Sequence, residues 1–176
     1  SVGTPVENVE IKIFDDTDHE MPPGQWGEIC VRGPGVMQGY WNKPEETVRA
    51  LRNGWLHSGD IGTMDDDGYV FIVDRVKDMI NMAGLKIWPA EVEQFLYRHP
   101  AVMELAVYGI PHPEKGETVK AAIVLKEGST ATAEEINDYC RKHLAVYKVP
   151  SEFEFLKELP KSPTGKILKR ILRDKE

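Results

Sequence analysis

The sequence predicts an α+β protein, in which a β-rich segment of residues 1–75 precedes a segment of mixed helices and strands. Three observations support this class. Residues 9–15 alternate between apolar and polar side chains, as a half-buried strand does. Residues 118–125 are apolar almost throughout, which is typical of a central strand. Residues 132–144 carry apolar side chains at helical spacing.

The remaining elements of the β-rich segment are short and separated by turns. Residues 28–31 form a predicted strand, and glycines follow it. A short helix is predicted over residues 43–51, because Pro44 and two acidic residues stand near its start. The acidic turn at residues 65–68 leads into a predicted strand at 69–73.

Downstream, helices and strands follow one another. A helix is predicted from residue 88 onward, with Pro89 near its first position, and it ends before Pro100. A strand is predicted over residues 103–110. The helix at 132–144 opens with a capping box, in which Thr132 and Glu135 bond each other's backbone. A last amphipathic helix is predicted over residues 167–173.

Composition excludes several classes of function. The chain has 176 residues and a net charge of -7, so a charged surface for nucleic acid is not expected. No apolar run is long enough to span a bilayer, and no signal peptide is evident. Cys30 and Cys140 are far apart and in no motif, so we expect a reducing, cytoplasmic location. The five histidines show no metal-ligand spacing, and no metal site is expected.

Three short segments could carry a ligand. Gly165 and Lys166 fail the phosphate-loop pattern, because Pro160 stands where the first glycine belongs and Ile167 where Ser or Thr belongs. Residues 63–74 partly imitate a calcium loop, but a hairpin turn explains them better. In HSGDIG, Asp60 is either part of an acidic turn or a carboxylate that accepts hydrogen bonds from two ribose hydroxyls.

Four motifs in order resemble the adenylate-forming (AMP-binding) enzyme superfamily of acyl-CoA ligases, luciferases and peptide-synthetase adenylation domains. They are GEICVRGPGVMQGYWNKPEET, GWLHSGDIG, DRVKDMINMAGLKIWPAEVE and PKSPTGKILKR. The segments DRVKDMI, YKVPSEFEF and LPKSPTGKILKR are most similar in sequence to prokaryotic fatty-acid–CoA ligases.

The resemblance implies a domain organisation. Residues 1–75 would be the C-terminal subdomain of the large AMP-binding domain, residues 76–78 a hinge, and residues 79–176 the small mobile C-terminal domain. The family's Ser/Thr/Gly-rich phosphate loop and its Tyr-Gly-x-Thr-Glu segment do not occur here. We therefore expect a C-terminal fragment that is inactive alone and whose partner is its own upstream domain.

The resemblance also implies a reaction and its residues. A carboxylic acid and ATP would give an acyl-adenylate and pyrophosphate, and coenzyme A would then take the acyl group. Mg²⁺ would be bound by ligands upstream. By motif position, Asp60 and Arg75 would hold the ribose, and Lys86 would lie near the nucleotide, where the family often has an arginine. The hinge would be Lys77, the pantetheine channel would border Ala83, Gly84 and Leu85, and the catalytic lysine of adenylation would be Lys166.

Other functions are compatible with the same sequence. An aryl-CoA ligase or a carrier-protein adenylation domain would share these motifs. A non-catalytic docking module is an alternative of another class. From composition alone, Lys166 is a solvated lysine in a basic tail that includes Lys161 and Lys169.

Overall fold

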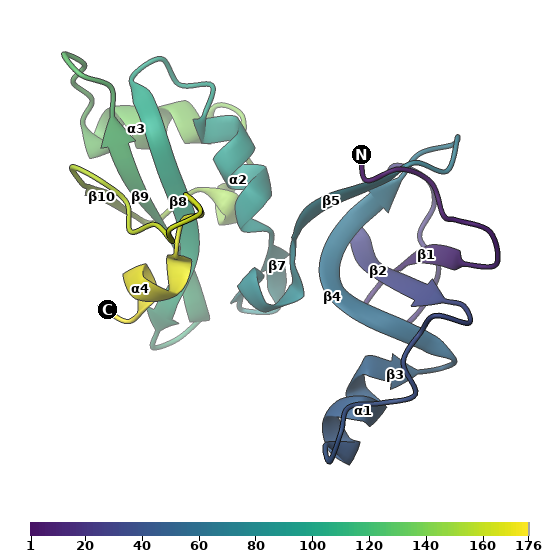
Figure 1. Cartoon of the computed structure of the whole chain (residues 1–176). Coiled ribbons are helices and arrows are strands. Elements are labelled where there is room, and N and C mark those ends of the chain that lie inside the picture. The colour runs from purple at the N-terminus through teal and green to yellow at the C-terminus, as the bar shows by residue number, and fades with distance from the viewer. Residues whose placement is uncertain (176) are drawn as a thin grey trace. The chain divides into compact units, whose positions relative to one another are not determined.

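The computed structural model describes residues 1–175, which form two compact units (Figure 1). The first unit comprises Ser1–Lys77, and the second begins at Asp78. Each unit contains its own sheet and its own apolar core, so the predicted α+β class is confirmed. Within residues 1–175, no helix combines the length and the apolar character that crossing a membrane requires.

The first unit is built on an antiparallel sheet of short strands with one helix beside it. The strand order is β1-β2-β4-β3, and β5 also pairs with β4. The strands predicted near residues 9–15, 28–31 and 69–73 and the helix predicted over residues 43–51 are confirmed, whereas the two strands between residues 51 and 64 were not predicted. Their bounds are β1 (Glu10–Phe14), β2 (Gly27–Arg32), α1 (Pro44–Ala50), β3 (Leu51–Arg52), β4 (Trp55–Met64) and β5 (Val70–Arg75).

Strand β4 organises this sheet, because it pairs with β2 on one edge and with β3 and then β5 on the other. Its register with β2 is irregular: Cys30 pairs with His57, whereas Glu28 pairs with Ile61. More residues of β4 than of β2 lie between these two pairs, so β4 bulges at residues 58–60. Bulges bend a strand and change the direction of its side chains.

The acidic segment between β4 and β5 is a hairpin turn, as predicted in preference to a calcium loop. The Asp65 side-chain oxygen accepts the backbone N–H groups of Asp67 and Tyr69, at 3.1 and 2.8 Å. The backbone N–H of Asp65 donates to the carbonyl of Tyr69. An aspartate that bonds its own turn in this way favours a tight connection between two strands.

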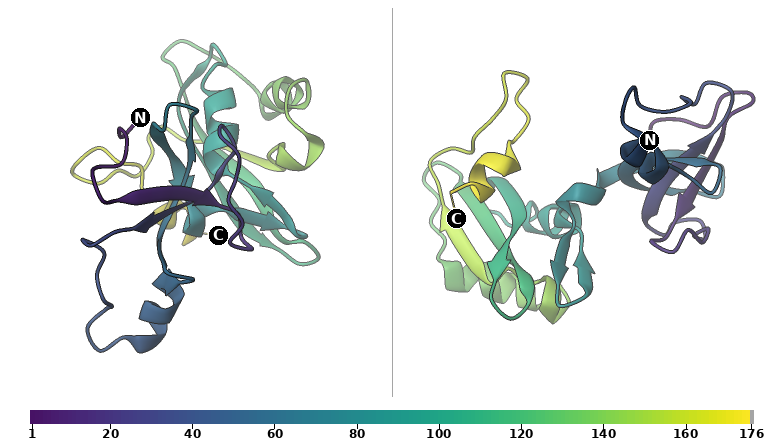
Figure 2. Two further views of the ribbon diagram at one scale, coloured as in Figure 1. Left: turned by 90° about the vertical axis from the view of Figure 1, so that its right-hand side faces the viewer. Right: turned by 90° about the horizontal axis from the view of Figure 1, so that it is seen from below.

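The second unit carries a mixed sheet with helices on both faces (Figure 2). A short 3-10 helix, Val76–Asp78, spans the boundary between the units, and another lies at Val146–Lys148. The other elements are β6 (Ile80–Met82), β7 (Leu85–Ile87), α2 (Pro89–Leu96), β8 (Val102–His112), β9 (Gly116–Leu125), α3 (Ala133–Arg141), β10 (Glu152–Phe155) and α4 (Lys169–Arg173).

Strand β9 is central in the second sheet, as its apolar sequence predicts. It pairs antiparallel with β8 and β6 and parallel with β10. Along β8 the side chains alternate between two buried clusters. Leu105 and Val107 join the cluster that includes residues of α2 and α3, whereas Ala106 and Tyr108 join the cluster that includes Leu172 of α4. Because both faces are covered, the central strand is apolar almost throughout.

The capping box predicted for α3 is confirmed. The Thr132 hydroxyl accepts the backbone N–H of Glu135 at 3.2 Å, and the Glu135 carboxylate accepts the backbone N–H of Thr132 at 2.8 Å. Ile136 and Cys140 of the helix are fully buried. Local capping and the apolar stripe therefore agree on the start and on the inward face of this helix.

The last helix is shorter than predicted, and this corrects the position of Lys166. Helix α4 begins at Lys169 rather than at residue 167. Ile167 instead forms a β-bridge with Lys161, and the Leu168 N–H donates to the carbonyl of Pro160. These backbone bonds hold the residues before the helix in an extended hairpin, so Lys166 lies in a turn and not at a helix N-terminus.

Candidate functional site

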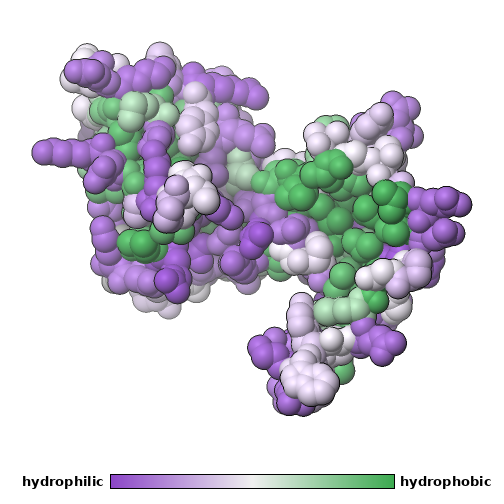
Figure 3. All heavy atoms as spheres, in the orientation of Figure 1, coloured by the Kyte–Doolittle hydropathy of each residue, from purple (hydrophilic) through white to green (hydrophobic). Residues whose placement is uncertain are grey.

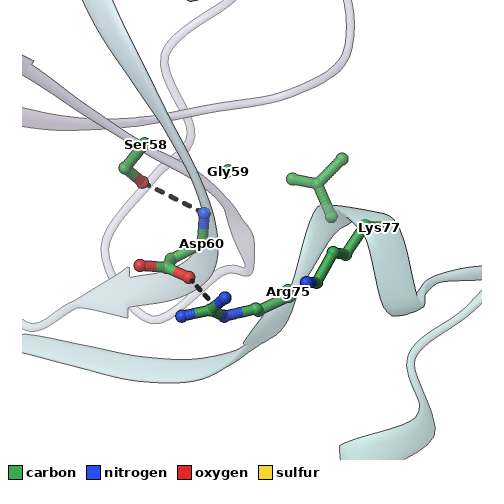
Figure 4. A pocket seen from close by; sticks show the side chains of 6 residues that line it. Ser58, Gly59, Asp60, Arg75 and Lys77 are labelled. Carbon is green, nitrogen blue, oxygen red and sulfur yellow. Dashed lines mark hydrogen bonds and ion pairs between the residues drawn. The ribbon is translucent and has the colours of Figure 1, made fainter. Parts of the chain in front are cut away.

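A hollow of about 420 Å³ opens in the first unit where β4 and β5 meet (Figure 4). A volume of this size is within the usual range for small-molecule sites. Its lining comes from the bulge of β4, from the end of β5 and from the 3-10 helix that follows. The lining residues are Ser58, Gly59, Asp60, Arg75, Val76 and Lys77.

A carboxylate and a guanidinium form an ion pair in this hollow. Asp60 and Arg75 are directly paired across β4 and β5, and the Arg75 Nε lies 3.2 Å from the Asp60 Oδ1. The Asp60 backbone N–H donates to the Ser58 Oγ at 3.1 Å. A carboxylate offers about four lone-pair positions, so Asp60 keeps acceptor capacity beside Arg75. The pair can therefore accept hydroxyl groups and donate to an oxygen-rich ligand at one place.

Two residues beneath the hollow were missed by the sequence reasoning. Glu28 of β2 accepts the Gly59 N–H through Oε1 at 3.0 Å and lies 2.8 Å from the His57 Nδ1 through Oε2. The His57 side chain is only 3% exposed and that of Glu28 is 15% exposed. The alternation of GEICVR places Glu28 on one face of its strand, but only the register with the bulged β4 shows that this face meets Gly59.

The same place holds a group of side chains that could bind a metal ion. Ligand atoms of Glu28, Cys30 and His57 all lie within 4.8 Å of one another. Carboxylate, thiol and imidazole groups are ligands that zinc accepts. The three residues are not in a recognisable sequence motif, so the sequence did not indicate this group. Burial and then the neighbouring Glu28 charge raise the pKa of the Cys30 thiol to about 12. Without a metal ion the thiol is therefore protonated at neutral pH, and binding a metal would have to release that proton.

The predicted coenzyme A residues lie in and after a tight turn of the second unit. Ala83 and Gly84 connect β6 to β7 and both have positive φ, 51° and 86°. The Asn81 side-chain oxygen accepts the Gly84 N–H at 3.0 Å, which fixes the turn. Leu85 is 46% exposed, and Lys86 of β7 pairs in register with Asn81. The turn is thus exposed, and apart from Gly84 and its two chain neighbours no heavy atom of the described chain lies within 4 Å of a Cβ built at Gly84.

Lys166 lies in a hairpin turn of the same unit. Its backbone N–H donates to the Ser162 Oγ at 3.1 Å, and its carbonyl accepts the Ser162 N–H at 2.8 Å. The neighbouring lysines form ion pairs: the Lys161 Nζ lies 2.5 Å from the Glu104 Oε1, and the Lys169 Nζ lies 2.8 Å from the Glu93 Oε1. Within residues 1–175 the Lys166 ammonium group is in no such ion pair, and the residue is exposed.

The structure brings some of the predicted residues together. Asp60, Arg75 and Lys77 line one hollow of the first unit. Residues 83–86 form a second group in the turn and at the start of β7, and Lys166 lies in a separate turn of the same unit. Ser58 and Val76 also line the hollow, although no sequence motif singled them out.

The first unit therefore offers a hollow with an Asp–Arg ion pair, and the second unit offers an exposed lysine in a hairpin turn. Residues 1–41 match the AMP-binding enzyme model, and residues 91–166 match the AMP-binding enzyme C-terminal domain. The chain belongs to this AMP-binding family.

Among characterised proteins, a long-chain-fatty-acid–CoA ligase of Escherichia coli O6:H1 is 51% identical over 174 residues, which cover 99% of this chain and 31% of the ligase. A feruloyl-CoA synthase of Amycolatopsis is 47% identical over 173 residues, or 98% of this chain and 35% of that enzyme. The ATP-bound MatB structure from Rhodopseudomonas palustris superposes with a TM-score of 0.89 at 36% identity, over 99% of this chain and 35% of MatB. The chain thus spans about a third of its relatives' length.

Proposed function

We propose that this chain is the C-terminal part of an ATP-dependent acyl-CoA ligase that acts on fatty acids. The observation that carries the proposal is the Asp60–Arg75 hollow, in a chain that is half identical along its length to a fatty-acid–CoA ligase. ATP, the carboxylic acid and coenzyme A are the substrates. In this proposal Asp60 accepts hydrogen bonds from the ribose hydroxyls, and Arg75 orients that carboxylate and adds a donor.

The first half-reaction joins two anions. A carboxylate oxygen of the acid attacks the α-phosphorus of ATP, the bond to the β-phosphate breaks, and pyrophosphate leaves. Lys166 is proposed to bridge the carboxylate and the α-phosphate as charge builds in the transition state. Its exposed position in a turn braced by Ser162, with paired lysines on either side, supports this role.

The second half-reaction transfers the acyl group to coenzyme A. The thiol loses its proton to solvent as its sulfur attacks the acyl carbon, the bond from that carbon to the phosphate oxygen breaks, and AMP leaves with the electron pair. We place the pantetheine arm beside Ala83, Gly84 and Leu85, where the exposed turn lets a ligand approach the backbone. Lys77 is the proposed hinge, and the boundary between the two compact units directly after it supports this assignment. Lys86 is proposed to contact the nucleotide as a point charge, because lysine lacks the fork of arginine.

An upstream domain is the proposed partner of the first unit. Apolar side chains gather over part of its surface (Figure 3), and β5 exposes Phe71 and Ile72 at 37% and 53%. Exposed apolar patches of this kind mark interaction surfaces. We place the ligands of the Mg²⁺ that accompanies ATP in that domain, because the Asp60 carboxylate in the hollow is already paired with Arg75.

The catalytic assignment is tested in the full-length protein with the Lys166→Ala variant. We expect a loss of at least about 10²-fold in the rate of ATP–pyrophosphate exchange, which is the usual effect of removing one transition-state contact. Thioester formation from supplied acyl-adenylate should persist. The matched control is Lys161→Ala, which removes a paired lysine of the same hairpin. Equal loss of both half-reactions in Lys166→Ala would contradict the assignment.

An aryl-CoA ligase is the second candidate, because a feruloyl-CoA synthase is nearly as similar to this chain as the fatty-acid ligase is. A panel of fatty and aromatic acids, assayed with the full-length protein and coenzyme A, separates the two. Turnover of fatty acids alone supports the first candidate.

A further inference from the structure

We propose that Glu28 is a positioning residue: it holds the bulge at residues 58–60 and thereby sets the Asp60 carboxylate in the geometry that receives the ribose. The inference rests on the proposed function of Asp60, and it assigns a new role to a residue that does not line the hollow. Its basis is the hydrogen bonding of the bulge.

The bulge takes Gly59 out of the regular ladder between β2 and β4. The register passes from Cys30 opposite His57 directly to Glu28 opposite Ile61. A backbone N–H in such a bulge loses its strand partner, and leaving it unbonded in a partly buried place is costly. Glu28 replaces that partner with a side-chain oxygen, 3.0 Å from the Gly59 N–H. Gly59 also has a φ of +74°, which glycine adopts without strain.

The Glu28 carboxylate is itself held on several sides. His57 Nδ1 lies 2.8 Å from its Oε2, and an Arg52 guanidinium nitrogen lies 3.5 Å away. Arg52 is fixed in turn by Asp18, at 3.0 Å. The Glu28 side chain is only 15% exposed. A charged acceptor in such a constrained, poorly solvated place makes a stronger bond to an N–H than a neutral or exposed group does.

Support of the bulge explains this cluster better than a cation site does. The Arg52 guanidinium already supplies positive charge to both Glu28 and Asp18. Cys30, which is fully buried, places its Sγ 3.2 Å from the His57 Nδ1. The Glu28 carboxylate links this cluster to the bulge through its bond from the Gly59 N–H, and Asp60 follows Gly59 directly.

The test uses ATP–pyrophosphate exchange by the full-length protein. In Glu28→Ala we expect the KM for ATP to rise about tenfold, the effect of losing one hydrogen bond to a charged group, with kcat changed less than about twofold. Glu28→Gln keeps an acceptor oxygen and should recover most of the affinity. Glu10→Ala is the control, because it removes a carboxylate paired with Arg32 in the same sheet, away from the bulge, and should keep the wild-type KM.

A double-mutant cycle separates positioning from general stabilisation. If Glu28 acts through Asp60, adding Glu28→Ala to Asp60→Ala should raise the KM for ATP no further, whereas a purely structural role would lower affinity in both backgrounds. A wild-type KM in Glu28→Ala, or full additivity, would overturn the inference while Asp60→Ala still shows its own effect. An unchanged ATP affinity in Asp60→Ala would instead overturn the proposed function and this inference with it.

Hydrogen exchange gives a readout that does not depend on any variant folding. The Gly59 amide of the wild-type protein should exchange slowly, because it is bonded to Glu28. Fast exchange at Gly59, with slow exchange at neighbouring residues of β4, would contradict the proposed bond.

Discussion

Asp60 and Arg75 lie directly opposite each other on β4 and β5, with the Arg75 Nε 3.2 Å from the Asp60 Oδ1. The two residues are 15 positions apart in the sequence and meet at the point where a bulge ends in one strand and the other strand leaves the sheet. A carboxylate held in this way by an arginine is oriented before a ligand arrives, which lowers the entropic cost of binding.

Removing the Asp60 carboxylate should weaken ATP binding. In Asp60→Ala of the full-length protein we expect the dissociation constant for ATP to rise about tenfold or more, because hydrogen bonds to a charged group contribute about 1.5–3 kcal/mol. Isothermal titration calorimetry measures the change. Asp66→Ala, which removes an exposed carboxylate at the far end of the same hairpin, is the matched control. Unchanged affinity in Asp60→Ala would contradict the ribose assignment.

A side chain at Gly84 should impair the coenzyme A step and leave adenylation intact. The residue has a φ of +86°, so alanine there costs roughly 1 kcal/mol of strain. A Cβ at Gly84 meets nothing within 4 Å, so the described chain can accommodate it. We expect Gly84→Ala to raise the KM for coenzyme A and to leave pyrophosphate exchange near the wild-type rate.

Gly128→Ala provides the control for Gly84→Ala, because Gly128 has a similar positive φ of 74° in a turn outside the proposed site. A KM for coenzyme A that rises equally in both variants would show that backbone strain alone is responsible.

Acidification should weaken the network that contains Asp18. The hydrogen bond from Arg52 is the main cause that holds the pKa of Asp18 below its ordinary value of 3.8. A depressed folded-state pKa stabilises the fold above 3.8, and this contribution is lost as the pH falls from 3.8 through the folded-state value. Asp18→Asn should therefore lower stability at pH 7 and flatten its acid dependence below pH 4.

Urea unfolding of the wild-type protein and Asp18→Asn, measured from pH 7 down to pH 3, checks this expectation. Asparagine tolerates the positive φ of 61° at this position, so the backbone is not perturbed. Stability curves that stay parallel over the whole range would show that Asp18 contributes nothing through its charge.

Both cysteines should be unreactive in the folded protein. Burial raises the pKa of Cys30 to about 12 and that of Cys140 to about 11. At pH 8 we expect a chromogenic disulfide reagent to modify neither thiol of the native chain and both thiols of the unfolded chain. The raised values also predict a loss of stability as the pH rises above 9.0, because the unfolded thiols then ionise first. Rapid labelling of the native chain would contradict the burial.

Local patterns predicted the helices and the longer apolar strands, but they did not predict β3, β4, β6, β7 or β10, and they placed the start of one helix too early. Helix α3 has its capping box and its apolar stripe within a dozen residues, so both signals are readable in sequence. Helix α4 was predicted to begin before Lys169, because Ile167 and Leu168 continue its apolar pattern. In the structure those residues take backbone partners, Lys161 and Pro160, on the other side of a turn. Non-local hydrogen bonds of this kind override helix propensity.

Some residues of the candidate site were predicted from sequence motifs, and others became evident only in the structure. Motif resemblance singled out Asp60, Arg75 and Lys77, which do line one hollow. It did not single out Glu28, which accepts the Gly59 N–H, or His57, which contacts Glu28. Their contribution depends on a bulge in β4, and no short pattern within GEICVR or HSGD specifies which residue of one strand faces which residue of the other.

By itself, the sequence determined the periodicities, caps and turns, because these depend on neighbours along the chain: the apolar run of β9, the capping box at Thr132 and the turn chemistry of Asp65. The tertiary structure alone decided the strand registers. Registers depend on contacts between segments far apart in the chain, and a slip of one residue would turn every side chain to the opposite face. That register sets Arg75 opposite Asp60 and places the Glu28 carboxylate under the Gly59 amide.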